Sequence, residues 1–150
     1  MLNKMESLNL PPDSQVGRIL VVDDTPDNLF LIETVLQAEG YQVEVADNGL
    51  DALSMIEAAP PHLLLLDVMM PGMHGYEVVR CIRQNSNLPF IPIILITGCE
   101  QLDTSEQFND TVEGFICKPI DFDQLLNQVS NILAMKDSSP NPFANQRLAS

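Results

Sequence analysis

The residues best suited to chemistry are three aspartates, a threonine and a lysine, each placed directly after a short apolar run. Asp23 and Asp24 follow the first such run, Asp67 the third, Thr97 the fourth and Lys118 the fifth. If these runs are parallel strands, all five side chains meet at one edge of a sheet. Three carboxylates there repel one another by about 4 kcal/mol per close pair at an effective dielectric of 20. A hard cation that prefers oxygen ligands, Mg²⁺ or Mn²⁺, would relieve that repulsion.

The same set is suited to accepting a phosphoryl group. A carboxylate beside a cation is the nucleophile, and a lysine opposite neutralises charge on the phosphoryl oxygens. Each residue alone has a simpler explanation, since an aspartate after a strand is usually a helix cap and Thr97 could be a turn residue. Five such residues after four different strands favour a site.

The positions of these residues depend on five predicted strands. Three of the runs are nearly continuous in Ile, Leu and Val, which is typical of strands covered on both faces of a parallel sheet. One run alternates, with Val43 and Val45 on one side, which favours an edge strand. The five runs are 18–22, 41–46, 63–66, 93–96 and 114–117.

Helical patterns separate the strands. One begins after Pro26 and is closed by Gly40, and the last begins at the N-cap Asp121. Two more have apolar stripes at 50–56 and 76–82. In 101–112 only Leu102, Phe108 and Val112 recur, which predicts a short or mobile fourth helix. Regular alternation of strand and helix predicts an α/β sandwich with right-handed crossovers, whose ligand site lies at the carboxyl ends of the strands.

Composition limits the classes of function. The chain has 150 residues with a net charge of −14, which disfavours binding to nucleic acid or anionic lipid. No apolar run approaches the ~18 residues that span a bilayer, and the N-terminus is a poor signal peptide, so we expect a cytoplasmic protein. Residues 1–16 and 137–150 are predicted tails around a domain at 17–136. The three cysteines have no zinc-binding spacing and are expected to be free thiols.

Four blocks of sequence resemble the signature blocks of bacterial response regulator receiver domains. The resemblance covers about residues 17–136 and implies a flavodoxin-like, doubly wound (βα)5 fold with a parallel sheet of strand order 2-1-3-4-5. The blocks, in order, are RILVVDD at 18–24, LLLLDVMMPGMHGYE at 63–77, IILITG at 93–98 and FICKPI at 115–120.

The resemblance implies a role for each site residue. Asp67 is the implied phosphoacceptor. Mg²⁺ would be bound directly by Asp24, Asp67 and the backbone carbonyl of Met69, with Asp23 acting mainly through water.

Further residues are implied to sense the phosphoryl group. Thr97 would hydrogen-bond it in the active state, and Lys118 would pair with one of its oxygens. Phe115 aligns with the family's aromatic switch residue, although without the resemblance it reads as core. The bond between Lys118 and Pro119 is expected to be cis.

The implied function is that of a single-domain response regulator, since no output domain follows the last helix. A sensor histidine kinase or histidine phosphotransfer protein would donate the phosphoryl group, and a downstream protein would receive the signal by contact. The protein would be an enzyme only in catalysing its own phosphorylation and dephosphorylation. In relatives the fourth helix, fifth strand and fifth helix form the face for homodimers or targets. Here 101–114 is acidic and lacks the family's Ala-Gly-Ala pattern.

Three other classes fit less well. A haloacid-dehalogenase-type phosphatase would have a DxDxT motif after the first strand, where this chain has Asp23-Asp24-Thr25. A flavodoxin-like FMN carrier would have a Ser/Thr/Gly-rich loop there. A scaffolding pseudo-receiver would lack some of the acceptor, acid pair, threonine and lysine that are all present here.

Overall fold

The computed structural model describes residues 17–98 and 111–137. Of the helix expected at 101–112, only the last two positions are described, and neither is helical. The elements follow in the order β1 (Arg18–Val22), α3 (Pro26–Ala38), β2 (Gln42–Ala46), α4 (Gly49–Ala58), β3 (Leu63–Asp67), α5 (Gly75–Gln84), β4 (Ile93–Gly98), β5 (Gly114–Lys118) and α6 (Phe122–Asp137).

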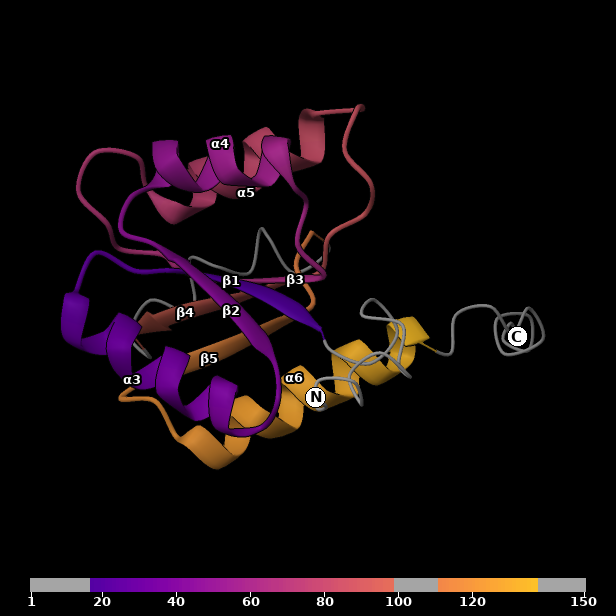
Figure 1. Ribbon diagram of the computed structural model, residues 1–150. Coiled ribbons are helices and arrows are strands. Elements are labelled where there is room, and N and C mark those ends of the chain that lie inside the picture. Colours follow the sequence, from indigo (N-terminus) through magenta and orange to yellow (C-terminus); the bar gives the residue numbers. More distant parts are fainter. Residues whose placement is uncertain (1–16, 99–110, 138–150) are drawn as a thin grey trace, which may run out of the picture.

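The five strands form one parallel sheet in the order β2-β1-β3-β4-β5. Helices α4 and α5 cover one face of this sheet, and α3 and α6 cover the other (Figure 1). The flavodoxin-like fold predicted from the sequence is therefore confirmed. Among the described residues, no helix has the length and apolar character required to cross a bilayer.

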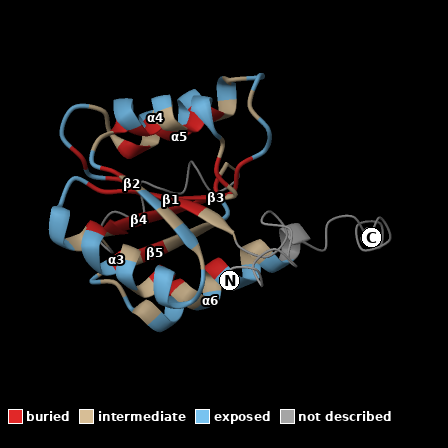
Figure 2. Cartoon of the chain, viewed as in Figure 1, coloured by how far each residue is buried: buried red, intermediate tan, exposed pale blue. Residues whose placement is uncertain are grey.

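The central strands are apolar because both of their faces are buried (Figure 2). Along β3, Leu64 and Leu66 pack into the core beneath α4 and α5, whereas Leu63 and Leu65 pack into the core beneath α3 and α6. Full burial of one such side chain stabilises the fold by about 1.5–3 kcal/mol. β2 is the edge strand that its alternation predicts, with polar residues exposed and its valines half-buried. The two cores fix the sheet, and the sheet fixes where its carboxyl ends lie.

Local signals in the sequence set the ends of the helices. Pro26 is the first residue of α3, where its missing N–H costs no hydrogen bond. Gly40, just after α3, has φ +97°, a left-handed conformation that favours glycine. The Asn48 side chain accepts a hydrogen bond from Asp51 N at 2.8 Å at the start of α4. Asp121 caps α6 as predicted, since its Oδ1 accepts from the backbone N–H of Asp123 at 2.9 Å.

Candidate active site

The five residues that the sequence singled out lie at the carboxyl edge of the sheet. Asp23 and Asp24 come directly after β1, as expected. The other strands are longer than predicted, so Asp67 and Lys118 are the last residues of β3 and β5, and Thr97 lies inside β4. The ladders continue to the site because Asp67 pairs with a β4 residue and Thr97 with a β5 residue. Hydrogen bonding between strands thus fixes the backbone around the site.

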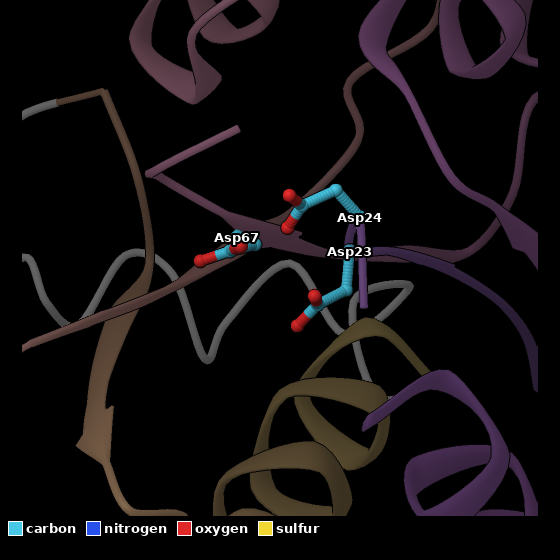
Figure 3. Close-up of side chains that lie close together, drawn as sticks. All are labelled: Asp23, Asp24 and Asp67. Carbon is cyan, nitrogen blue, oxygen red and sulfur yellow. The ribbon is translucent and has the colours of Figure 1, made fainter. Parts of the chain in front are cut away.

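The side chains of the three aspartates lie close together (Figure 3). One carboxylate oxygen from each of Asp23, Asp24 and Asp67 lies within 4.8 Å of the others. Asp23 is 0% exposed and Asp67 1% exposed, whereas Asp24 is exposed to solvent. The cluster therefore has two buried oxygen ligands and one that faces water.

Lys118 is the cation of this cluster. Its Nζ lies 3.2 Å from Asp67 Oδ1 and 3.9 Å from Asp23 Oδ2. The Lys118–Pro119 peptide bond is cis, as predicted. One positive charge thus faces three carboxylates, and the site keeps an excess of negative charge.

The carboxyl group of Asp67 is electrostatically strained. Burial, and secondly the carboxylate of Asp23, raise the pKa of Asp67 to about 6, and Lys118 opposes this rise. Lys118 pairs with Oδ1, and the backbone N–H of Met69 makes a weaker contribution in the same direction. With so few donors near them, these buried oxygens next to two further carboxylates fit a hard divalent cation.

This strain predicts how stability depends on pH in metal-free protein. Since the pKa of Asp67 is about 6 in the folded state against 3.8 for an unperturbed aspartate, ionisation destabilises the fold as pH rises through that interval. Each pKa unit corresponds to about 1.4 kcal/mol. The stability gained by Asp67→Asn over wild type is therefore expected to be about 2–3 kcal/mol larger above the folded-state pKa of about 6 than below the unfolded-state value of 3.8. Urea unfolding with chelator, at pH values on either side of this interval, measures the difference, and an equal gain at both would contradict it.

The loop after Asp67 is fixed by a close approach of α5. Gly75 N donates to Val68 O at 2.9 Å. A Cβ atom at Gly75 would lie 2.5 Å from Asp67 O and 2.7 Å from Val68 Cα, which are backbone atoms that cannot move aside cheaply. The missing side chain therefore lets α5 pack against the backbone of Asp67 and Val68. Met69 lies within this loop and is 50% exposed.

The two residues expected to sense the phosphoryl group lie at different depths, Thr97 near the carboxyl end of β4 and Phe115 early in β5. Thr97 is 0% exposed. Phe115 is partly buried against the core beneath α4 and α5, and its carbonyl oxygen accepts from Gln128 Nε2 at 3.1 Å. The structure thus places Thr97 at the site and Phe115 in the core. Along the β4–β5 ladder, the residue pair that contains Phe115 comes directly before the pair that contains Ile96.

Two features of the site were not expected from the sequence. Asn28, in the first turn of α3, donates from Nδ2 to Asp23 Oδ2 at 3.3 Å. The signal in the sequence that could have identified Asn28 is its place as a polar residue one helical turn after the pair Asp23-Asp24. The expectation of free thiols is wrong for Cys117, which is disulfide-bonded, while Cys81 is free. Cys117 is the neighbour of Thr97 in the register of the β4–β5 ladder, which the spacing of the cysteines in the sequence did not reveal. Cys99 lies outside the described residues.

Comparison with protein families and sequences gives consistent matches. The model of the response regulator receiver domain family matches residues 19–130. The protein PilH of Pseudomonas aeruginosa is 31% identical over 126 residues, which cover 79% of this chain and 99% of PilH. The response regulator PleD of Caulobacter vibrioides is 39% identical over 121 residues, covering 80% of this chain but 27% of PleD.

Solved structures give the same picture. The response regulator TrrA of Thermotoga maritima, solved in complex with Mg²⁺-BeF, has a TM-score of 0.70 and 33% identity, and the match covers 78% of this chain and 99% of TrrA. The chemotaxis response regulator CheY4 of Vibrio cholerae has a TM-score of 0.73 and 28% identity, and the match covers 79% of this chain and 99% of CheY4.

Proposed function

The chain belongs to the family of response regulator receiver domains, and we propose that it accepts a phosphoryl group on Asp67 and signals by protein–protein contact. The observation that supports this most directly is the buried Asp67 carboxylate, 3.2 Å from Lys118 Nζ and clustered with two further aspartates. Intact-mass spectrometry after incubation with a small phosphodonor and Mg²⁺ tests the proposal. A chain that gains no phosphoryl group would contradict it.

The proposed donor is a phosphohistidine of a sensor histidine kinase or a histidine phosphotransfer protein. A carboxylate oxygen of Asp67 attacks phosphorus, so an O–P bond forms while the P–N bond to the imidazole breaks. The electron pair of the P–N bond returns to the imidazole nitrogen, which takes a proton from water. Lys118 then pairs with a phosphoryl oxygen and Thr97 donates a hydrogen bond to another. The protein catalyses only its own phosphorylation and the later hydrolysis of the acyl phosphate.

The acidic cluster is proposed to bind Mg²⁺, or Mn²⁺ in its place. Asp24, Asp67 and the Met69 backbone carbonyl would be direct ligands, and Asp23 would act through water. When bound, the cation neutralises charge on the phosphoryl oxygens. The convergence of three carboxylates supports this assignment, as does the relative TrrA, which was solved with Mg²⁺-BeF.

Signalling is proposed to proceed through Thr97 and Phe115 to a downstream protein. Of the family's dimer or target face, the fourth helix expected at 101–112 lies almost wholly outside the described residues, whereas β5 and α6 are described. A net charge of −14 supports a protein partner over nucleic acid or an anionic membrane, and a cytoplasmic location is part of the proposal.

The donor protein is proposed to dock over α3 and the loop after β5. A groove of about 250 Å³ lies there beside Lys118, and Leu31, which is 48% exposed, contributes to its apolar lining. Because this groove adjoins the nucleophile's lysine, a protein that presents phosphohistidine to Asp67 would cover it.

A charged substitution in this groove should separate protein donors from small donors. Leu31→Asp is expected to slow transfer from a histidine phosphotransfer protein at least about tenfold, the effect of about 1.4 kcal/mol. Phosphorylation by acetyl phosphate should change little. Phe90→Asp is the matched control, because Phe90 is also exposed but lies at the opposite edge of the sheet, before β4. Equal slowing of both donors by Leu31→Asp would contradict docking at this groove.

A further inference from the structure

The carboxylate of Asp23 is a buried charge fixed by two neutral donors. Asp23 is 0% exposed. Its Oδ1 accepts from the backbone N–H of Thr25 at 2.9 Å, and its Oδ2 accepts from Asn28 Nδ2 at 3.3 Å. A buried charge is costly unless it is hydrogen-bonded, so these donors decide how the carboxylate is oriented. Thr25 contributes its backbone, whereas Asn28 contributes a side chain that substitution can remove.

The Asp23 oxygen that Asn28 contacts, Oδ2, is also the Asp23 oxygen that pairs with Lys118. Lys118 Nζ lies 3.9 Å from Asp23 Oδ2, against 3.2 Å from Asp67 Oδ1. The amide of Asn28 satisfies Oδ2 without adding charge, so the lysine is not needed there and stays with the nucleophile. Asn28 and Lys118 line the same groove, and both approach Oδ2 of Asp23.

We propose that Asn28 is a positioning residue for the phosphorylation site, acting through Asp23. Asn28 keeps the Asp23 carboxylate oriented toward the site that Asp23 shares with Asp24 and Asp67. Because Asn28 satisfies Asp23, Lys118 remains paired with Asp67. This inference rests on the proposed function, because it assigns Asn28 a role in the binding of Mg²⁺ at that site. Asn28 is thus proposed to orient the Asp23 carboxylate and to keep the Lys118 ammonium group beside Asp67.

Removal of the amide is expected to weaken Mg²⁺ binding about tenfold, the lower end of the effect found when a hydrogen-bond partner of a metal-binding residue is lost. The lower end applies because Thr25 N still holds Oδ1. Helix α3 itself should not suffer, since alanine is a better helix former than asparagine. A weaker affinity in a protein of unchanged stability would therefore be specific to the site.

The experiment is calorimetric titration of the full chain with Mg²⁺ for Asn28→Ala, alone and combined with Asp23→Asn. Thr34→Ala, at an exposed position of the same helix, is the control. We expect about tenfold weaker binding for Asn28→Ala alone, and less than about twofold further weakening in the Asp23→Asn background, because the charge that Asn28 orients is then gone. Asn28→Leu, which removes the donor but keeps the side-chain size, should behave as Asn28→Ala and replaces it if that variant does not fold.

Two results would overturn the inference while the proposed function stands. In one, wild type and Asn28→Ala bind Mg²⁺ equally well. In the other, Asn28→Ala weakens binding by the same factor in both backgrounds, which would mean a general structural role. Absence of Mg²⁺ binding by the wild-type chain would instead contradict the metal site of the proposed function, and the inference with it.

Discussion

The Asp67→Asn variant is expected to gain no phosphoryl group under conditions in which the wild-type chain gains one. An amide is a far poorer nucleophile than a carboxylate, and Asp67 is the acidic residue of the cluster that faces Lys118 most closely, at 3.2 Å. Incubation with acetyl phosphate and Mg²⁺, followed by intact-mass spectrometry, measures the effect. Because Asn is nearly isosteric with Asp and relieves charge in a crowded site, the variant should remain folded.

The matched control is Asp27→Asn, which makes the same chemical change at an exposed position in the first turn of α3. Asp27 is outside the cluster of converging carboxylates, so this variant should be phosphorylated like wild type. If Asp67→Asn gained as much mass as wild type, the acceptor would be another residue and the proposed function would lose its central assignment.

Mg²⁺ is expected to stabilise the wild-type fold strongly, and Asp24→Ala should remove most of that effect. A cation that binds only the folded state at a concentration 100 times its Kd adds about 2.7 kcal/mol to the free energy of unfolding. Asp24 is the exposed member of the cluster, so alanine there leaves no buried cavity. Without metal, the variant should be at least as stable as wild type, because one of three mutually repelling carboxylates is gone.

Thermal unfolding with Mg²⁺ and with chelator tests this prediction, together with phosphorylation by acetyl phosphate, which Asp24→Ala should slow greatly. Asp27→Ala serves as the control, since it removes an acidic residue three positions further along the chain without touching the cluster. A wild-type midpoint that does not respond to Mg²⁺, or an Asp24→Ala midpoint that responds as wild type does, would rule out the acidic cluster as the metal site.

The sequence by itself determined the elements and their order. Continuous apolar runs, an alternating edge strand, Pro26, Gly40 and Asp121 predicted where strands and helices lie, and the structure confirms them within 17–98 and 111–137. Such signals depend on the residue and its near neighbours in the chain, so they are readable without coordinates. Strand ends were predicted one or two residues short at Asp67, Thr97 and Lys118, because polar residues do not continue an apolar run even where the ladder continues.

The sequence also determined which residues meet. In a parallel sheet the carboxyl ends of all strands lie at one edge. The alternation of elements therefore predicted that five residues would meet there: Asp23, Asp24, Asp67, Thr97 and Lys118. Their roles in phosphoryl transfer and metal binding stay predictions that the proposed experiments test.

Only the tertiary structure decided how the residues at that edge differ from one another. Asp23 and Asp67 are buried whereas Asp24 is exposed, Lys118 lies closer to Asp67 than to Asp23, and Asn28 is bonded to Asp23. Burial and the pKa of Asp67 depend on atoms contributed by helices and strands far apart in sequence. These are properties of packing, and packing is set by how the two cores on either side of the sheet bring α3, α5 and α6 against the strand ends.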